Sequence, residues 1–462
     1  MGVAIDERND GERARAGVTP GTRGFAHAPE VAGGTPMAKA PDPELGSAVI
    51  PKERYTSADF AAREWEGMWR RVWLLAGCEA DIREPGDYLT FEIGGESILV
   101  ARLPSGRIAA RHNVCMHRGN RLREPGVGHA DRFSCIFHGW EYDLDGTLLK
   151  VTDGQCFPQG TPKAELSLRP VACDTWGGFV WVNLDSRAGS LRDYLGVLPR
   201  HLDPYHFEHQ TVVNDVTIEI DCNWKTCVDA FNESYHVQAT HPRLMEYSDD
   251  VNVQIDCYER HSRFLYPLAV VSPRLGRGSE LTDPIREMFL RGIGLDPAPL
   301  EGRGDRVREA IARQMREVVG PAMGVDFAEL NDDQLVDDYH YTIFPNVTLN
   351  IHARGAWVFR HRPHPSDPQK MYFDFWNLLR APRAQIERGE HEERRLADGY
   401  SLAHIPGGDV LDEDMYNLPR IQAGMRSAAF PGLWLSTQEL RIRHFHDTLV
   451  RYVDGDRAAN GA

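Results

Sequence analysis

Two pairs of metal-binding side chains constrain this chain more than any other feature of its 462 residues. Cys115 and His117 form the first pair, Cys135 and His138 form the second, and 17 residues separate the pairs. Each pair can chelate a metal from one short turn. Thiolates hold iron–sulfur clusters well, whereas neutral imidazoles leave a cluster less negative and raise its reduction potential. The four side chains therefore suit a [2Fe-2S] cluster that accepts electrons at moderate potential.

A structural zinc site is the alternative, because two cysteines and two histidines also bind Zn²⁺. Ligand identity alone does not separate the two sites. The surroundings favour the cluster, since the Cys-x-His spacing is tighter than that of a zinc-finger knuckle. Glycines at 119 and 139 and the Asp145-Gly146 turn also allow the backbone to approach sulfides closely.

The chain is longer than one hydrophobic core normally supports, so we expect two domains with appendages. Residues 1–48 are rich in Gly, Ala, Pro and charge, which predicts a flexible arm, and 456–462 a flexible tail. Residues 49–73 include an amphipathic helix from Thr56, with Asp59 in its first turn. Short β-rich runs predict a small all-β domain over 74–185. Strand-like runs mixed with helical ones at 224–240, 300–320 and 384–399 predict a larger α+β domain over 186–455, built on an antiparallel sheet with covering helices.

A second group of candidate ligands begins after Asn223. Asp229, Glu233 and His236 follow at positions i, i+4 and i+7, so one helix would place them in a single stripe. His241 comes five residues after His236, which turns it away from that stripe. A metal shared by both histidines therefore requires a π-type widening or an end to the helix. Pro242 favours an end, since the residue before proline avoids the α region.

With both groups in view, the chain resembles the Rieske non-haem iron oxygenases, in particular the large (alpha) subunits of the aromatic ring-hydroxylating dioxygenases. The C-x-H and C-x-x-H loops followed by Gly-Trp match the Rieske domain. The N-W-K, E/D-x-Y-H and H pattern matches the catalytic domain at Asn223, Trp224, Lys225, Glu233, Tyr235, His236 and His241. The resemblance implies that Cys115, His117, Cys135 and His138 bind the cluster and that His236 and His241 bind a mononuclear Fe(II). It also implies that the 49–73 helix packs on the catalytic domain.

A third, anionic ligand would complete the 2-His-1-carboxylate face that binds Fe(II) and leaves positions open for O2 and substrate. The family takes it from an acidic cluster near the C-terminus. Asp414 matches the D-x-x-N and Q-x-G-M pattern, with Asp409, Asp412 and Glu413 as replacements. A solvated acidic helix start is the alternative explanation of this cluster. Pro419 should kink or restart the helix.

The resemblance gives Glu233 a catalytic role, because the family's acidic residue at this position links an iron ligand to a cluster histidine of a neighbouring subunit. Many ring-hydroxylating members have Asp there, and Glu is more similar to the quaternary-amine branch. Asp229 either adds to this network or is an ordinary carboxylate on a helix surface. We expect an apolar substrate pocket lined from 229–245, 255–275 and 340–360.

Partners follow from charge and from the resemblance. A net charge of −16 argues against nucleic-acid binding. Without a run of roughly 18 to 20 uncharged apolar residues or a hydrophobic signal core, we expect a cytoplasmic protein that does not enter the membrane. We find no dinucleotide fingerprint, so electrons should come from a ferredoxin, an NAD(P)H-dependent flavin reductase, or both. The family commonly forms trimers, some with a small beta subunit.

Three functions remain open. The leading hypothesis is mono- or dihydroxylation of an aromatic or other hydrophobic small molecule, using O2. The second is oxidative N- or O-demethylation or quaternary-amine monooxygenation within the same family. The third is an electron-transfer or zinc-stabilised binding module without oxygen chemistry.

Overall fold

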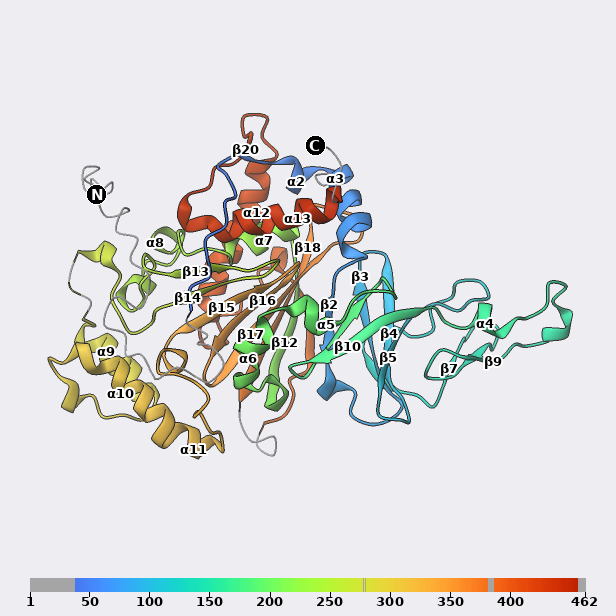
Figure 1. Cartoon of the computed structure of the whole chain (residues 1–462), viewed down its shortest axis with the longest axis horizontal. Helices are drawn as coiled ribbons and strands as arrows, with labels where there is room; N and C mark the ends of the chain where they lie inside the picture. The colour runs from blue at the N-terminus through green and yellow to red at the C-terminus, as the bar shows by residue number, and fades with distance from the viewer. Residues whose placement is uncertain (1–37, 277, 279, 381–385, 456–462) are drawn as a thin grey trace.

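The computed structural model describes residues 38–276, 278, 280–380 and 386–455. These residues form two lobes. A narrow β lobe projects to the right of Figure 1, and a broad sheet with helices forms the rest. The expected tail and residues 1–37 of the expected arm lie outside the described residues. Residues 38–48 contain no helix or strand, but Ala40 donates a backbone hydrogen bond to Asp256 (2.6 Å). This part of the expected arm therefore lies against the larger lobe.

The narrow lobe is built on β-strands, as predicted for this part of the chain, and the short α4 (Lys163–Leu166) is its one α-helix among the described residues (Figure 1). Its larger sheet has the order β2-β11-β10-β5-β4-β3-β6, and its smaller sheet the order β7-β8-β9. The strands are β2 (Leu74–Cys78), β3 (Asp87–Ile93), β4 (Glu96–Arg102), β5 (Ile108–His112), β6 (Val127–His129), β7 (Phe133–Ser134), β8 (Glu141–Tyr142), β9 (Leu148–Lys150), β10 (Pro170–Trp176) and β11 (Phe179–Asn183). All of their pairings in the described residues are antiparallel.

The broad sheet has the order β13-β14-β15-β16-β17-β18-β12-β19. It is antiparallel, as predicted, except at one edge, where β19 runs parallel to β12. The strands are β12 (Gln210–Ile220), β13 (Gln254–Cys257), β14 (Ser262–Tyr266), β15 (Asp338–Ile343), β16 (Val347–His352), β17 (Gly355–Pro363), β18 (Met371–Arg380) and β19 (His391–Arg395). A short pair, β1 (Ile50–Pro51) and β20 (Gly432–Leu433), joins the two ends of the described chain.

Helices cover the broad sheet, and α7, α12 and α13 gather above it in Figure 1. The helices are α2 (Glu53–Thr56), α3 (Ala58–Glu64), α4 (Lys163–Leu166), α5 (Leu191–Leu195), α6 (Leu198–Leu202), α7 (Trp224–Ala230), α8 (Val237–Thr240), α9 (Asp283–Gly292), α10 (Val307–Gln314), α11 (Gly320–Met323), α12 (Gly408–Met425) and α13 (Leu440–Asp454). The α+β class, with a small β domain ahead of a larger domain of sheet and covering helices, is thereby confirmed.

Three local expectations are corrected. The amphipathic helix expected from Thr56 begins as α3 after Ser57, whose side chain caps it by accepting a hydrogen bond from the Phe60 N–H. The segment 384–399 has no α-helix where it is described: His391–Arg395 form β19, whose backbone hydrogen bonds to β12 outweigh helix propensity, and Leu396–Asp398 form one 3-10 turn. Helix α12 continues through Pro419 without restarting.

The N-terminal helices contact both lobes. Trp69 lies edge-on against Trp224 of α7 (centroids 4.8 Å apart), as expected for packing on the catalytic domain. Trp65 instead covers Gly94 in the β3–β4 turn, where a Cβ would collide with the indole ring and φ is +55°. Only glycine tolerates both constraints. The segment therefore packs between the lobes.

A buried ion-pair group also ties the lobes together. Asp374 on β18 contacts Arg360 (2.9 Å) and Arg362 (2.7 Å) on β17. Arg360 then donates to the backbone carbonyls of Leu75 and Ala76 on β2, and Arg362 donates to a carbonyl on β3. The two arginines therefore hold the β lobe through its backbone, and Asp374 holds the arginines.

Candidate metal centres

The two Cys/His loops have the same backbone design. The Cys115 N–H donates to the Asn120 carbonyl and the Cys135 N–H to the Trp140 carbonyl, both at 2.8 Å. The carbonyl of each cysteine accepts a hydrogen bond from a glycine N–H four residues later, and both glycines have positive φ. These turns expose backbone N–H groups on the inside of each loop.

The donors on these loops point at the sulfur atoms. The Phe137 and His138 N–H groups donate toward Cys135 and, although burial opposes it, hold the pKa of this thiol below its usual value. The Tyr142 hydroxyl lies 3.3 Å from the Cys115 sulfur. Donors aimed at sulfur stabilise thiolates and bridging sulfides. The sulfur side of the site therefore suits an iron–sulfur cluster.

The histidine side fits the same group. The His117 and His138 rings meet at 4.6 Å between centroids, and His117 stacks on Trp140. The Nδ1 atom of His117 is buried and has no hydrogen-bond partner among the described residues. A neutral imidazole nitrogen in this state is a ready metal ligand. The two histidine rings therefore lie together, and Cys115 and Cys135 lie close enough to act on each other's pKa.

The second group assembles around the short helix α8, which lies between the two histidines. Helix α7 ends at Ala230, so the predicted stripe of Asp229, Glu233 and His236 along one helix is wrong. The predicted helix end before Pro242 is confirmed, because α8 stops at Thr240 and His241 leaves the helical region (φ −121°, ψ 52°). This break turns both imidazoles toward the same side.

Asp414 on α12 faces both imidazoles. Its Oδ1 lies 2.9 Å from Nε2 of His241 and 3.5 Å from Nε2 of His236. One ligand atom from each of the three side chains lies within 4.8 Å of the others. Two nitrogens and one carboxylate oxygen at this spacing form the facial set that Fe(II) prefers in oxygenases.

Two further carboxylates hold the outer nitrogens of these rings. Glu233 lies 2.5 Å from Nδ1 of His236, and Glu413 lies 2.7 Å from Nδ1 of His241. Burial lowers the pKa of His236, but the charge and hydrogen bond of Glu233 outweigh it and raise that pKa to about 9. The site thus attracts cations. Such outer carboxylates fix the ring orientation of metal-bound histidines.

The other acidic candidates point elsewhere. Asp409 pairs with Arg243 (2.9 Å), and Asp412 accepts hydrogen bonds from the 401–403 loop. The sequence pattern offers Glu413 only as a replacement ligand, whereas the structure places it on the outer nitrogen of His241. On a helix, a residue next to Asp414 points about 100° away from it, so sequence order alone hides this role.

Asp229 belongs to a different network. It is buried, and its carboxylate accepts a hydrogen bond from the Tyr55 hydroxyl (2.5 Å), which also contacts His446 (2.6 Å). The carboxylate is therefore not on a helix surface, and among the described residues no hydrogen bond or ion pair joins it to His236 or His241. Tyr55 and His446 gave no sequence signal, because neither belongs to a spaced motif.

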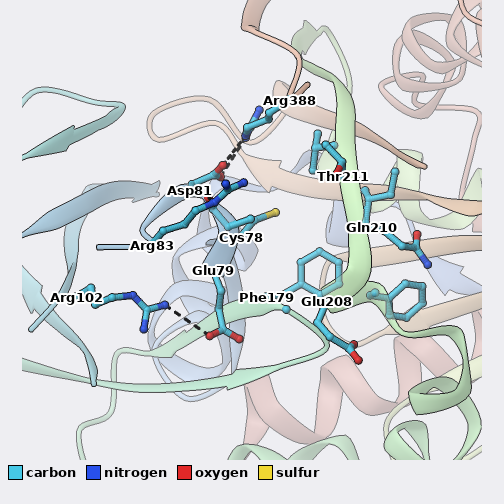
Figure 2. Close-up of a pocket in the computed structure, with 15 residues that line it drawn as sticks. Cys78, Glu79, Asp81, Arg83, Arg102, Phe179, Glu208, Gln210, Thr211 and Arg388 are labelled. Carbon is cyan, nitrogen blue, oxygen red and sulfur yellow. Dashed lines mark hydrogen bonds and ion pairs between the residues drawn. The ribbon is translucent and has the colours of Figure 1, made fainter. Parts of the chain in front are cut away.

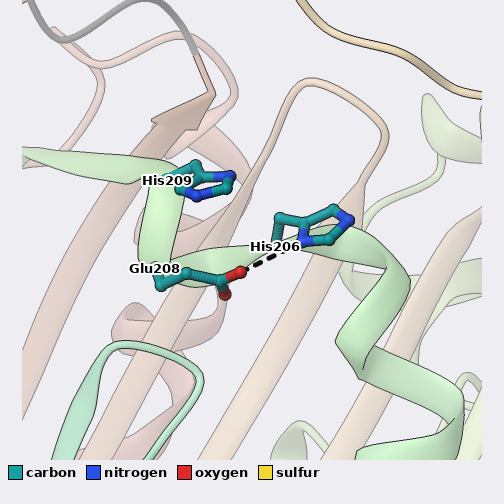
Figure 3. Close-up of side chains that lie close together, drawn as sticks. All are labelled: His206, Glu208 and His209. Carbon is teal, nitrogen blue, oxygen red and sulfur yellow. Dashed lines mark hydrogen bonds and ion pairs between the residues drawn. The ribbon is translucent and has the colours of Figure 1, made fainter.

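A second His/Glu group lies on the molecular surface and was not predicted. His206 contacts Glu208 (3.0 Å, Figure 3) and Glu329 (2.8 Å), and His209 stacks beside it (5.5 Å). Both ring nitrogens of His206 already have carboxylate partners. This is the arrangement of a protonated imidazole, whose pKa the two carboxylates raise although burial opposes it.

A cavity of about 350 Å³ lies where the lobes meet, away from α8. Arg388 pairs with Asp81 at its edge and Arg102 approaches Glu79 (3.8 Å), as Figure 2 shows. The segment 340–360, from which we expect part of the substrate pocket, supplies six side chains to the main core of the broad sheet: Tyr341, Ile343, Phe344, Val347, Leu349 and Ile351.

Comparisons with known families agree with these two centres. The model of the ring hydroxylating alpha subunit (catalytic domain) matches residues 207–455, and the model of the Rieske [2Fe-2S] domain matches 72–161. No helix among the described residues is long and apolar enough to span a bilayer.

Individual relatives extend the likeness over both lobes. The glycine betaine monooxygenase oxygenase subunit of Chromohalobacter salexigens is 34% identical over 431 residues, covering 89% of this chain and 88% of the relative. The chlorobenzene dioxygenase subunit alpha of a Cupriavidus species is 36% identical over 194 residues, which are 40% of this chain and 42% of the relative.

Solved structures share the fold. The quaternary ammonium Rieske monooxygenase CntA in complex with L-carnitine matches with a TM-score of 0.64 at 18% identity, covering 88% of this chain and 97% of that one. Naphthalene 1,2-dioxygenase with indole bound matches with a TM-score of 0.62 at 20% identity, covering 90% and 94%.

The family uses a Rieske [2Fe-2S] cluster and a mononuclear iron, takes electrons from a reductase or ferredoxin, and oxidises small organic molecules with O2. The chain belongs to the ring-hydroxylating alpha-subunit family of Rieske oxygenases, and it is an iron-dependent oxidoreductase.

Proposed function

We propose that this chain is the oxygenase component of a monooxygenase that oxidises an N-methyl group of a small quaternary amine. The observation that carries the proposal is the likeness to glycine betaine monooxygenase across 88% of that relative, whereas the chlorobenzene dioxygenase match covers 42% of its relative. Glu233, rather than Asp, gives independent support from the sequence. The leading aromatic hypothesis thus becomes the second candidate, favoured by the dioxygenase matches.

The metal ligands are part of this proposal. Cys115, His117, Cys135 and His138 would hold the cluster, and His236, His241 and Asp414 would hold the iron. When bound, the iron would activate O2 with electrons that the cluster supplies. The proposed domain limits are 74–185 for the Rieske domain and 186–455 for the catalytic domain.

The chain's own residues would orient and separate the two centres. Glu233 and Glu413 accept from the outer nitrogens of the iron-site histidines, which leaves both Nε2 atoms facing Asp414. Gln422 fixes α12 against α7, because its side-chain oxygen accepts from the Asn223 N–H (2.9 Å) and the Thr226 hydroxyl (3.1 Å). Asp414 is therefore presented from a rigid helix pair.

The two centres lie at opposite ends of one chain. The cluster loops adjoin β7 and β8 at the right of Figure 1, and α8 lies at the left. We therefore propose an assembly, a homotrimer by likeness to the family, in which the cluster of one chain serves the iron of the next. Exposed apolar residues beside each centre support such a contact: Ile136 and Phe137 follow the cluster ligand Cys135, and Tyr235 precedes the iron ligand His236.

The electron donor and the compartment are proposals as well. A ferredoxin or an NAD(P)H-dependent flavin reductase would reduce the cluster. Free thiols buried in the core, among them Cys222 and Cys227, suit the reducing cytoplasm.

Oxygen uptake with a surrogate reductase tests the function. We expect formaldehyde release with methylated quaternary amines, because hydroxylation of an N-methyl carbon gives an unstable carbinolamine. Oxygen uptake with benzene or chlorobenzene, measured under the same conditions, provides the comparison. If diols or phenols formed and no amine released formaldehyde, the aromatic candidate would replace this one.

A further inference from the structure

Two histidines and a glutamate meet on the turn that leads into β12, outside both proposed metal centres. His206, Glu208 and His209 each offer one ligand atom, and these atoms lie within 4.8 Å of one another. Figure 3 shows the Glu208 carboxylate directed at His206, with the His209 ring beside them. The His-x-Glu-His spacing thus gathers two imidazoles and a carboxylate on one short turn.

The turn holds the two imidazoles in a fixed relation. The His206 carbonyl accepts a hydrogen bond from the His209 N–H (2.9 Å), which closes a 3-10 turn over Phe207–His209. The two rings stack with 5.5 Å between their centroids and 16° between their planes. Gly178 of the narrow lobe rests on this turn so closely that a Cβ there would lie 2.6 Å from the Glu208 Cα. The turn therefore has little room to shift.

Glu329 holds the outer nitrogen of His206. Its carboxylate lies 2.8 Å from Nε2, and the Glu208 carboxylate lies 3.0 Å from Nδ1. Ionised carboxylates only accept hydrogen bonds, so Nδ1 must carry either a proton or another cation where it faces Glu208. The iron-site histidine His241 has the same plan, with one carboxylate on each ring nitrogen. An outer carboxylate of this kind orients an imidazole that binds metal.

The charges around the turn favour a cation. Arg380 is a guanidinium close enough to act on His206, and its charge also interacts with Glu208, Glu329 and Asp326. Three carboxylates and one guanidinium leave these surroundings negative while the imidazoles are neutral. A bound divalent cation would offset that charge.

The donor atoms select the class of cation. Zn²⁺ binds imidazole nitrogens and carboxylate oxygens at about 2.0–2.2 Å, usually in a tetrahedron, which places its ligand atoms roughly 3.4 Å apart. The 3.0 Å between Nδ1 of His206 and Glu208 is close to that spacing. Glu208 and His209 are exposed side chains that can turn toward the same point. Ca²⁺ and Mg²⁺ prefer sites made of oxygen atoms, so two nitrogens and one oxygen favour a transition metal.

We propose that His206, Glu208 and His209 bind a divalent transition metal of the Zn²⁺ class, with Glu329 orienting His206. The proposal is independent of the proposed function, because none of these residues belongs to the cluster site or the iron site. Glu329 comes 123 residues after His206. A bound metal would therefore join two distant segments and brace the turn beneath Gly178, which gives it a structural role where the narrow lobe is seated.

An ordinary surface ion-pair group is the alternative, with a proton on Nδ1 of His206 in place of a metal. The two interpretations differ at His209. Both ion pairs of His206 are made with glutamates. The proton-bound group therefore keeps its ion pairs without His209, whereas the metal site loses a ligand.

A Zn²⁺ titration of the holoenzyme, loaded with cluster and iron, separates the two interpretations. The protein competes with a chromophoric chelator near pH 8, because a metal must displace the proton from Nδ1, and its iron content is measured after each addition. We expect His209→Ala to weaken Zn²⁺ binding at least about tenfold, since even an outer partner of a metal ligand contributes about 10- to 100-fold. Zinc that displaced iron would enter the other site and would be counted equally in both proteins.

His129→Ala is the matched control, because this histidine pairs with a carboxylate, Asp87 (2.9 Å), and belongs to no ligand group among the described residues. It should bind Zn²⁺ as the wild type does. Glu329→Gln is a second variant that keeps all three ligands, and it should also bind Zn²⁺ more weakly. Equal affinities in the wild type, His209→Ala and Glu329→Gln would overturn the metal site, as would a wild type that binds zinc only by displacing iron.

The structural role has its own measurement. Zinc should raise the melting temperature of the wild type and leave that of His209→Ala unchanged, because a metal that binds only the folded chain stabilises it. Zinc binding without such a rise would overturn the structural role.

Discussion

Each histidine beside α8 uses its two ring nitrogens differently: Nδ1 contacts a glutamate and Nε2 faces Asp414. Removing one ring should therefore empty the iron site without disturbing the cluster, whose ligands are separate. We predict that His236→Ala keeps the Rieske absorption band and loses nearly all turnover and mononuclear iron. His206→Ala, which removes a half-buried histidine far from these ligands in the sequence, should keep both. Loss of cluster colour in folded His236→Ala would mean that the ligands are partitioned wrongly.

The two glutamates allow a matched comparison at the same scale. Both accept from an Nδ1 atom, but only Glu233 occupies the position that the family uses between the two centres. We predict that Glu233→Gln retains both metals and slows turnover about 10- to 100-fold, measured as single-turnover oxidation of the reduced cluster. Glu413→Gln should have the smaller effect, because Glu413 is partly exposed and shares Arg243. Equal rates in the two variants would remove Glu233 from electron delivery.

At the residue scale, the proposed cluster ligands could be predicted from the sequence, because two metal-binding side chains one or two residues apart can bind the same metal centre. The sequence predicted neither Glu413 nor the Tyr55–Asp229–His446 group as partners. Those contacts join residues from distant segments, and no local pattern records which side chains meet across a fold.

Among the elements, β17 and β18 carry the buried charge group that ties the lobes. Burial opposes ionisation of Asp374, but Arg360 and Arg362 outweigh it and hold its pKa below the usual value. Its stabilising contribution is thus complete above the unfolded-state pKa of about 4 and is lost as pH falls through the folded-state value. We predict that Asp374→Asn lowers the free energy of unfolding by roughly 3–5 kcal/mol, measured by denaturant titration at pH 7.

The control is Asp305→Asn, which alters an exposed pair with Arg306 and should change stability by less than about 1 kcal/mol. A wild-type protein with flat stability between pH 5 and 2.5, or an Asp374→Asn variant as stable as Asp305→Asn, would contradict the expected role of Asp374.

Element prediction worked where side-chain periodicity reports burial, as in β15 and β18. It failed over 384–399, where charged residues suggested a helix but β12 offered an unpaired edge. It also failed along α7, which stops at Ala230 although Asp229, Glu233 and His236 have helical spacing. Backbone pairing and tertiary contacts decide such cases, and neither is local in sequence.

For the whole molecule, the separation of the two centres in Figure 1 has a direct test. Chains with Cys135→Ser should lack a working cluster, and chains with His236→Ala should lack the iron. We predict that each variant alone is inactive and that mixed assemblies regain turnover, because the intact cluster of one chain can serve the intact iron of its neighbour. Activity should be measured after co-expression, with separately purified and unmixed variants as controls. Inactive mixed assemblies would favour electron transfer within one chain.

The two-lobe architecture and its order were predictable, since composition and motif spacing change near residues 74 and 186. The angle between the lobes was not, because it depends on Trp65 over Gly94 and on arginines that bind backbone carbonyls of another sheet.

Arg360 and Arg362 bind backbone carbonyls of β2 and β3 at the base of the narrow lobe. This lobe is a long projection in Figure 1, and the cluster loops lie toward its far end. Such a projection acts as a lever: a slight tilt at its root becomes a large excursion at its tip. Electron tunnelling weakens exponentially with distance, so a substitution at the root can cost more in turnover than in melting temperature.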